Sequence, residues 1–127
     1  MRDVVIVGAV RTPIGRYCGV LRDVPVYKLG SLVLNEVVKR ANVKPEQVDN
    51  VIMGQAYQNG ECANVARMAL LDAGWPVGVP GTTVDQACCS GVQSILLGTM
   101  EIQTGNAEIV VAGGVESMSR AEFYISG

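Results

Sequence analysis

Short apolar runs rich in β-branched residues alternate with longer segments of helical periodicity along the chain. Runs of this kind are typical of strands covered on both faces, and turn-forming residues separate them from the helical segments. The pattern therefore predicts four strands and three helices in alternation. The expected strands cover residues 3–10, 48–54, 81–86 and 108–115, and the expected helices cover 26–41, 64–73 and 88–104.

Two of the expected helices have recognisable ends. Lys39 and Arg40 lie in the last turn of the first helix, where positive charge interacts favourably with the helix dipole. Asn64 is suited to cap the start of the second helix, and Gly74 is suited to end it. These local signals support the limits of both helices.

The β-α-β-α-β-α-β order predicts an α/β fold. Parallel strands joined through helices form a mostly parallel sheet with right-handed crossovers and helices on both faces. We therefore expect one layered α/β/α domain over residues 1–127, a length typical of a single domain. Because 49% of the residues are hydrophobic, such a domain can form a core without disulfides or metal ions.

The expected helix at 88–104 is apolar on nearly all sides. A helix of this kind is buried between layers or between subunits. The rest of a 127-residue domain offers little to cover it, so we expect further polypeptide to pack against it. The apolar residues are Val92, Ile95, Leu96 and Ile102 on one side, and Leu97 and Met100 on another.

The composition disfavours several classes of function. The net charge is −2 and no cluster of Lys and Arg is present, which argues against nucleic-acid binding. The longest apolar runs are too short to cross a bilayer, and the run after Met1 is too short for a signal peptide. We therefore expect a cytoplasmic protein without membrane contact. No Gly-x-Gly-x-x-Gly sequence is present, which disfavours a dinucleotide-binding enzyme.

The four cysteines do not suggest a metal site. Cys18, Cys62, Cys88 and Cys89 lack Cys-x-x-Cys spacing, and the chain has no His to complete a mixed ligand set. A disulfide between the neighbours Cys88 and Cys89 would strain the backbone, so we expect reduced thiols. Cys18 and Cys62 are interpreted as small buried side chains, and Cys89 as a packing residue just inside a helix.

The sequence around Cys88 suggests a nucleophile. An expected strand is joined to an expected helix by TVDQACCSGVQSI, residues 83–95, and Cys88 lies at the amino end of that helix. Unpaired N–H groups and the positive end of the helix dipole favour a thiolate there. A sharp strand-to-helix turn also exposes the nucleophile in many covalent enzymes. Asp85 is either a turn residue that ends the strand or a negative charge that disfavours a nearby thiolate.

A second candidate segment follows the last expected strand. Gly113 and Gly114 lie at the end of an apolar run, and sites in parallel sheets gather at the carboxyl ends of the strands. The two glycines indicate either close backbone contact at such a site or a simple turn that leaves the sheet. The sequence leaves both interpretations open.

Four segments of the chain together resemble the thiolase family. The most specific match to the family pattern N-x-x-C-[GSA]-S-G is DQACCSG, residues 85–91. The family's first strand and R-T-P-x-G segment resemble VVIVGAVRTPIGRYCGVLRDV, residues 4–24. Its second strand and Asn-x-x-Arg helix resemble VDNVIMGQAYQNGECANVARMALLDAG, residues 48–74. A further family signature is similar to VAGGVESMS, residues 111–119.

Thiolases are acyl-CoA C-acyltransferases that form or cleave a carbon–carbon bond between acyl groups. The resemblance implies that Cys88 is the nucleophile that takes the acyl group as a thioester, and that its backbone N–H contributes to an oxyanion hole. It also implies that Cys89 fills the small-residue position after the nucleophile, while Asp85 stands where the family usually has Asn. Coenzyme A and acyl-CoA are then substrates, with no permanently bound cofactor and no metal.

Family members are longer chains with two similar α/β halves and an inserted loop domain that binds coenzyme A. The resemblance therefore implies that residues 1–127 form an N-terminal thiolase-like domain, an incomplete N-terminal half. The His that activates the nucleophile, the second catalytic Cys and most of the coenzyme A site are expected outside this sequence. The expected partners are acyl-CoA substrates and a complementary C-terminal thiolase half, in a homo- or hetero-oligomer.

Three functions are compatible with these observations. The first is a catalytic part of a thiolase that is inactive alone, and the second is a noncatalytic thiolase-like interaction subunit, since no general base lies within the chain. The third is a thiol redox or peroxide-sensing role for Cys88 and Cys89, which fits a thiolate but not the geometry of a resolving cysteine. A related ketosynthase is disfavoured because the ESMS-containing segment favours a thiolase.

Overall fold

Three parallel strands form one sheet in the computed structural model, which describes residues 2–127. The central strand β1 (Asn50–Gly54) pairs with β2 (Gly81–Val84) on one side and with β3 (Val110–Gly114) on the other. The predicted strands at 48–54, 81–86 and 108–115 are confirmed with slightly shorter limits. Because the strands are parallel, their carboxyl ends meet at one edge of the sheet.

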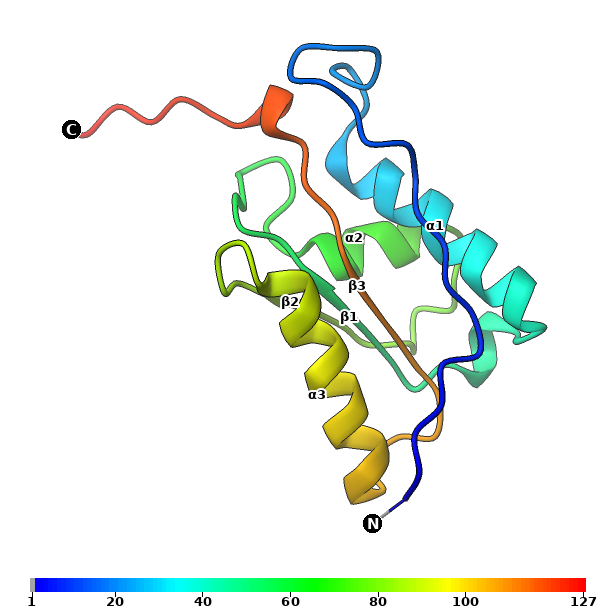
Figure 1. Ribbon diagram of the computed structural model, residues 1–127. Coiled ribbons are helices and arrows are strands. Elements are labelled where there is room, and N and C mark those ends of the chain that lie inside the picture. Colours follow the sequence, from blue (N-terminus) through cyan, green and yellow to red (C-terminus); the bar gives the residue numbers. More distant parts are fainter. Residues whose placement is uncertain (1) are drawn as a thin grey trace.

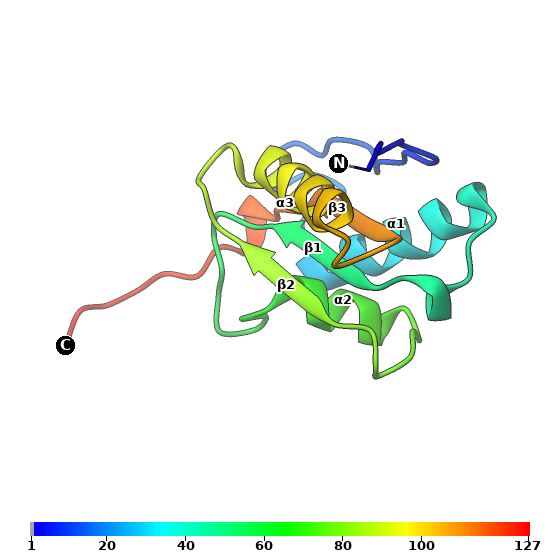
Figure 2. The same ribbon diagram turned by 90° about the horizontal axis from the view of Figure 1, so that it is seen from below.

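Helices cover both faces of this sheet. Figures 1 and 2 show α1 (Val26–Ala41) and α2 (Val65–Asp72) on one face and α3 (Ser90–Thr104) on the other. Two short 3-10 helices, η1 (Pro45–Gln47) and η2 (Met118–Arg120), lie in the connections before β1 and after β3. The layered α/β/α arrangement predicted from the order of the elements is confirmed.

The core lies between the central strand and the helices. Side chains of a strand point alternately to opposite faces of the sheet, and β1 is buried on both. Val51 and Met53 belong to the cluster that includes α1 and α2, whereas Ile52 is buried but lies outside that cluster. The continuous apolar run of β1 is therefore explained by burial on both faces.

The ends of α2 follow the predicted signals. The Oδ1 atom of Asn64 accepts hydrogen bonds from the Arg67 N–H at 3.0 Å and from the Thr83 hydroxyl at 2.8 Å. Gly74 has a positive φ of 78°, a conformation that favours glycine and ends the helix. The predictions for Asn64 and Gly74 are confirmed. Asn42 ends α1 in the same left-handed conformation, and no signal for this cap was identified in the sequence.

The predicted strand at residues 3–10 is wrong for this structure. Residues 2–10 form no strand, and the side chains of Val5, Ile6 and Val7 are exposed. β-branched residues favour an extended backbone, but a strand forms only where another backbone lies within hydrogen-bonding distance. No such neighbour is present beside residues 3–10 within the described part of the chain.

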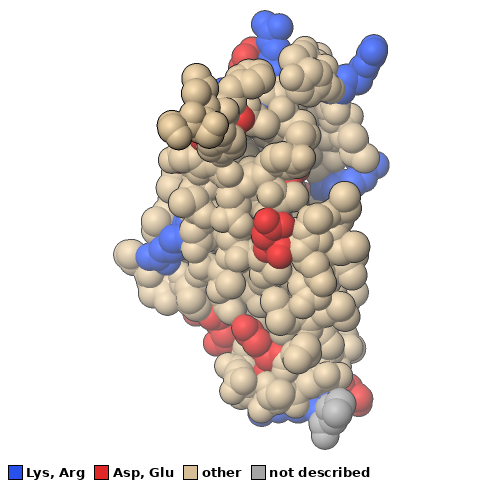
Figure 3. Space-filling model, turned by 90° about the vertical axis from the view of Figure 1, so that its left-hand side faces the viewer, with Lys and Arg blue, Asp and Glu red and all other residues tan. Residues whose placement is uncertain are grey.

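Four large apolar residues of α3 are exposed: Val92, Ile95, Leu96 and Met100. The side of α3 that is buried carries the small residues Ser90, Ser94 and Gly98, whereas Val92 and Leu96 are exposed. Figure 3, which views the side on which α3 lies, shows a surface with few charged side chains. The predicted helix at 88–104 is confirmed from residue 90 onward, and its apolar surface remains exposed within residues 2–127.

Asp49 joins the connection before β1 to the start of β3, and it makes the fold sensitive to acid. Its Oδ2 atom accepts hydrogen bonds from the N–H groups of Ile109 at 3.0 Å and Glu108 at 2.7 Å. These bonds hold the pKa of Asp49 below its usual range. Since the folded pKa is lower than the unfolded value of about 3.9, these bonds stabilise the fold above that pH. Their contribution is lost as the pH falls through the folded value.

We expect the Asp49→Asn variant to lose part of this acid sensitivity. The Asn side-chain oxygen still accepts both hydrogen bonds, but it does not titrate. Urea unfolding midpoints measured between pH 7 and about 2.5 should therefore fall less steeply below pH ~4 in the variant than in the unmodified chain. Parallel pH profiles for the two proteins would contradict this prediction.

Candidate functional site

A tight turn joins β2 to α3 at the carboxyl edge of the sheet. Residue 84 ends β2, and Cys89 is the N-cap residue of α3, which begins at Ser90. Cys88 lies one residue before the cap, and its side chain is exposed. The structure thus brings Cys88 to the strand-to-helix position that the sequence predicts for a nucleophile.

Ala87 gives this turn its shape. Its φ is 49°, a left-handed conformation that is uncommon for residues other than glycine and costs about 1 kcal/mol or more. The Ala87 N–H donates a hydrogen bond to the Asp85 Oδ1 atom at 2.9 Å. The prediction that Asp85 is a turn residue is therefore confirmed, and its carboxylate stabilises the strained residue beside Cys88. The effect of the Asp85 charge on a thiolate stays a prediction.

Ser90 holds the turn from inside. Its side chain is 4% exposed, and its Oγ atom accepts a hydrogen bond from the Gln86 N–H at 2.8 Å and donates one to the Ala87 carbonyl at 2.6 Å. The Cys89 N–H donates to the Gln86 carbonyl at 3.1 Å. These hydrogen bonds fix the backbone on both sides of Cys88, and none of them uses the Cys88 N–H.

Glycines let the start of α3 approach the ends of β1 and β3. A Cβ atom on Gly54 would lie 2.3 Å from the Ser90 carbonyl carbon, and one on Gly114 would lie 3.2 Å from the Gly91 Cα atom. A Cβ atom on Gly113 would meet nothing within 4 Å. The glycines at the end of β3 were predicted to indicate either close backbone contact or a simple turn that leaves the sheet. Close backbone contact is confirmed for Gly114.

Glu116 connects the ends of two strands. It follows β3, and its carboxylate accepts hydrogen bonds from the N–H groups of Ala56 at 2.8 Å and Tyr57 at 3.3 Å, just after β1. The roles of Glu116, Gly54 and Ser90 were not predicted from the sequence. The only available signals were a glycine at the end of an apolar run and polar residues close to Cys88 and to the last strand.

Asn64 and Arg67 begin and end an Asn-x-x-Arg sequence, and the side chains of both hold the backbone before and at the start of β2 in place. Besides capping α2, Asn64 donates a hydrogen bond from Nδ2 to the Gly81 carbonyl at 3.0 Å. The Arg67 guanidinium donates to the carbonyls of Val79 at 2.6 Å and Val77 at 2.9 Å. Both residues hold the connection between α2 and β2 and so set the position of β2.

The predicted burial of the other three cysteines is confirmed for one of them and wrong for two. Cys62 is buried as predicted, and burial, followed by the nearby Glu61 charge, raises the pKa of its thiol. The interpretations of Cys18 and Cys89 as buried packing residues are wrong, because both are exposed. Cys18 lies in a loop with a positive φ of 53°, and Cys89 caps a helix whose outer surface is uncovered.

The chain is similar to known proteins in both sequence and fold. The family profile described as "Thiolase, N-terminal domain" matches residues 4–126. The chain belongs to the thiolase family. It is 46% identical to the acetyl-CoA acetyltransferase of Cupriavidus necator over 127 residues, which is 100% of this chain and 32% of that protein.

A solved thiolase structure has the same fold. The crystal structure of the Bacillus anthracis acetyl-CoA acetyltransferase matches with a TM-score of 0.94 and 47% identity, covering 96% of this chain and 31% of that one. The mitochondrial acetyl-CoA acetyltransferase of Danio rerio is 41% identical over 126 residues, covering 99% of this chain and 30% of that protein. The chain thus spans about a third of the length of these thiolases.

Several expectations for this thiolase-family chain remain predictions. Among residues 2–127, no helix is both long enough and apolar enough to cross a membrane, and no three Cys, Asp or Glu side chains are grouped to hold a metal ion. The absence of a metal and of a nucleic-acid partner stays a prediction. Because the relatives include a mitochondrial protein, a cytoplasmic location also stays a prediction.

Proposed function

We propose that this chain supplies the nucleophile of an acyl-CoA C-acyltransferase of the thiolase type. The observation that carries the proposal is the exposed Cys88 at the start of α3, on a turn fixed by Ser90 and Asp85. The positive end of the helix dipole favours negative charge at this position. The Cys89 and Ser90 N–H groups already donate to the carbonyls of Gln86 and Ala87, so the proposed donor to an oxyanion is the Cys88 N–H. Membership of the thiolase family supports the same assignment.

The proposed reaction passes through a thioester on Cys88. The Cys88 thiolate attacks the carbonyl carbon of an acyl-CoA, the bond from that carbon to the coenzyme A sulfur breaks, and the coenzyme A thiolate leaves and takes up a proton. A second acyl-CoA loses a proton from its α-carbon, and this carbon attacks the thioester to release the Cys88 thiolate. The reverse sequence cleaves a 3-ketoacyl-CoA. The Cys88 N–H stabilises the negative charge that develops on the carbonyl oxygen.

The remainder of the catalytic machinery is proposed to come from other thiolase polypeptide. The chain has no His, and the Asp85 carboxylate is held by the turn, so neither supplies the base. Residues 1–127 then act as an N-terminal thiolase-like domain, with acyl-CoA and coenzyme A as substrates. A complementary C-terminal half supplies the base and most of the coenzyme A site, and the exposed apolar surface of α3 supports assembly into an oligomer.

A noncatalytic thiolase-like interaction subunit is the second candidate. The exposed apolar side chains of α3 favour it, because they form a surface for assembly that does not depend on Cys88. The two candidates differ in one respect: only the catalytic one requires that Cys88 be acylated.

A chimera tests the proposal directly. In this protein, called the thiolase chimera, our chain replaces the 127 matched residues of the Cupriavidus necator acetyl-CoA acetyltransferase. Brief exposure to acetyl-CoA followed by peptide mass spectrometry should place one acetyl group on the peptide that contains Cys88. A folded chimera that binds acetyl-CoA but leaves Cys88 unmodified would support the interaction subunit instead.

We expect the Asp85→Asn variant of the thiolase chimera to be acetylated faster. Asn retains the oxygen that accepts the Ala87 N–H, but it removes a negative charge three residues from Cys88. Because both groups are exposed and screened by solvent, the expected gain in acetylation rate is about two- to fivefold. Stopped-time mass spectrometry measures this rate. The exposed Asp23→Asn variant is the matched control and should not change it, and an unchanged or slower rate for Asp85→Asn would contradict the prediction.

A further inference from the structure

Ser90 binds the peptide group that joins Ala87 to Cys88. The Ala87 carbonyl oxygen accepts two hydrogen bonds from Ser90, one from its N–H at 3.2 Å and one from its hydroxyl at 2.6 Å. A carbonyl oxygen has two lone pairs, so both bonds form together and fix the direction of the carbonyl. Because the Ala87 carbonyl and the Cys88 N–H belong to one planar peptide group, whatever holds the first also holds the second.

The Cys88 N–H points away from Ser90. In a trans peptide group the carbonyl and the N–H lie on opposite sides, and no peptide bond among residues 2–127 is cis. The Ala87 carbonyl is directed toward Ser90, which is buried. The Cys88 N–H is therefore directed away from this buried residue, and it donates no backbone hydrogen bond within the described part of the chain.

Ser90 is itself held in place on two sides. Its Oγ atom accepts a hydrogen bond from the Gln86 N–H at 2.8 Å while its hydroxyl donates to the Ala87 carbonyl. Its backbone lies against the end of β1, where a Cβ atom on Gly54 would be 2.3 Å from the Ser90 carbonyl carbon. The central strand thus sets the position of Ser90, and Ser90 sets the direction of the peptide group before Cys88.

We propose that Ser90 is a positioning residue for the acylation of Cys88, and that it keeps the Cys88 N–H free to donate to the carbonyl oxygen of the bound thioester. Negative charge develops on this oxygen as the Cys88 thiolate attacks. A donor that is oriented before the substrate binds stabilises this charge without reorganisation. The inference rests on the proposed function, since only a reacting thioester presents such an oxygen.

Two reactions of the same thiol distinguish this role from a merely structural one. In acetylation by acetyl-CoA, negative charge develops on a carbonyl oxygen that the Cys88 N–H can bind. In alkylation by iodoacetamide, the sulfur–carbon bond forms as the carbon–iodine bond breaks and iodide leaves, so no oxyanion forms. Loss of the Ser90 hydroxyl should therefore slow acetylation but not alkylation. A displacement of the whole Cys88 residue would slow both reactions.

The Ser90→Ala variant of the thiolase chimera tests the inference. Complete removal of an oxyanion donor lowers the rate by about 10²–10³, so we expect misorientation of the donor to slow acetylation of Cys88 by about ten- to a hundredfold. The rate of alkylation should stay unchanged. Ser94→Ala is the matched control, because Ser94 is also buried in α3 but its hydroxyl binds the carbonyls of Gly91 and Gly113. It should leave the ratio of the two rates unchanged, and timed peptide mass spectrometry measures both.

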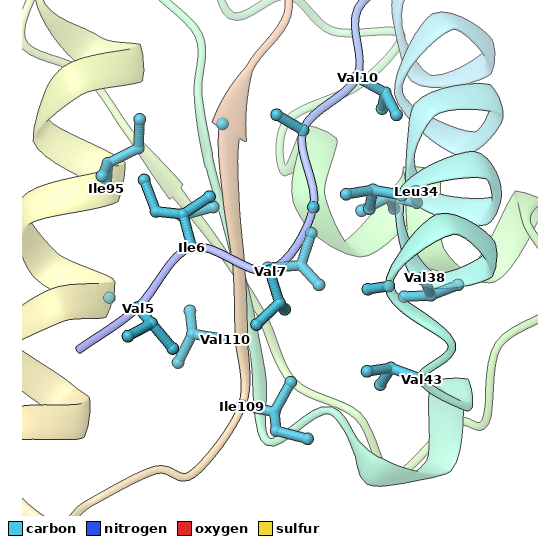
Figure 4. Close-up of a pocket in the computed structure, with 18 of the residues that line it drawn as sticks. Val5, Ile6, Val7, Val10, Leu34, Val38, Val43, Ile95, Ile109 and Val110 are labelled. Atoms are coloured by element: carbon cyan, nitrogen blue, oxygen red, sulfur yellow. The ribbon is translucent and has the colours of Figure 1, made fainter. Parts of the chain in front are cut away.

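The two serines are equally separate from the largest apolar space in the molecule. Figure 4 shows an open cavity of about 360 Å³ that is bounded by Ile95 of α3, Val110 of β3 and Leu34 of α1. No residue from 54 to 94 lines it. A difference between the Ser90→Ala and Ser94→Ala variants therefore reports on the turn before α3 and not on this cavity.

Amide exchange in the chain of 127 residues tests the geometry without a substitution, and it decides the matter if the Ser90→Ala variant does not fold. The N–H groups of Cys89 and Ser90 donate to the carbonyls of Gln86 and Ala87 at 3.1 and 3.2 Å. Relative to intrinsic rates, the Cys88 amide should exchange at least about tenfold faster than both. Residue-resolved NMR measures the three rates, and equal protection of the three amides would overturn the inference.

The outcomes separate this inference from the proposed function. An unmodified chimera that leaves Cys88 without an acetyl group contradicts the proposed function, and the inference falls with it. If the unmodified chimera is acetylated but Ser90→Ala slows neither reaction, or slows both alike, the positioning role is overturned and the proposed function stands. A selective loss of acetylation that Ser94→Ala shares would also overturn the role assigned to Ser90.

Discussion

The Cys88→Ala variant of the thiolase chimera is expected to lose acyl transfer almost completely. Without the thiolate no thioester forms, and loss of a catalytic nucleophile lowers kcat by about four to six orders of magnitude in enzymes of this kind. Cys88 is exposed and makes no side-chain hydrogen bond among residues 2–127, so its removal leaves the turn intact. The expected defect is therefore chemical and not structural, and a coupled assay of coenzyme A release measures it.

Cys89 provides the control for this prediction. It is the neighbouring exposed thiol, but it caps α3 instead of preceding it. The Cys89→Ser variant should keep acyl transfer within about tenfold of the unmodified chimera, because Ser is small and also suited to a helix N-cap. If Cys88→Ala retains acyl transfer while Cys89→Ser abolishes it, the nucleophile is assigned to the wrong sulfur.

The Gly54→Ala substitution is expected to have the largest effect on stability. Its Cβ atom would lie 2.3 Å from the carbonyl carbon of Ser90, which is backbone and cannot rotate away. Either β1 or the start of α3 must move, and overpacking of this severity costs about 3 kcal/mol. We expect a lower urea midpoint for the chain of 127 residues. In the chimera we expect slower acetylation of Cys88, because the turn before α3 shifts with Ser90.

Gly78→Ala is the matched control for Gly54→Ala. Gly78 lies in the loop before β2, and an added Cβ atom would meet nothing within 4 Å. Its effect on the free energy of unfolding should stay within about 0.5 kcal/mol. Equal urea midpoints for the two variants would show that the close contact between Gly54 and the start of α3 does not fix the position of the turn that carries Cys88.

Local features of the fold were predictable from the sequence. The limits of α1 and α2 depend on residues within each helix, such as the Asn64 cap and the Gly74 terminator, and both helices formed as expected. The position of Cys88 before α3 was also predictable, because a strand-to-helix turn is set by a few consecutive residues.

The residues that hold the candidate site in place could not be predicted from local sequence patterns. Gly54 and Glu116 act on residues that are more than thirty positions away in sequence, through contacts that exist only once the strands are aligned. The exposure of Cys18 also depends on its loop, which no local pattern reveals. A single sequence carries no information about such distances, so these roles required the structure.

The sequence by itself determined the thiolase resemblance, the α/β class, the limits of α1 and α2 and Cys88 as the candidate nucleophile. Only the tertiary structure decided that Gly114 is a contact residue, that Asp85 is a turn residue and that residues 3–10 form no strand here. The physical reason is that helix caps and tight turns use hydrogen bonds between near neighbours in the chain. A strand needs a partner from elsewhere, and its sequence can favour an extended backbone without supplying that partner.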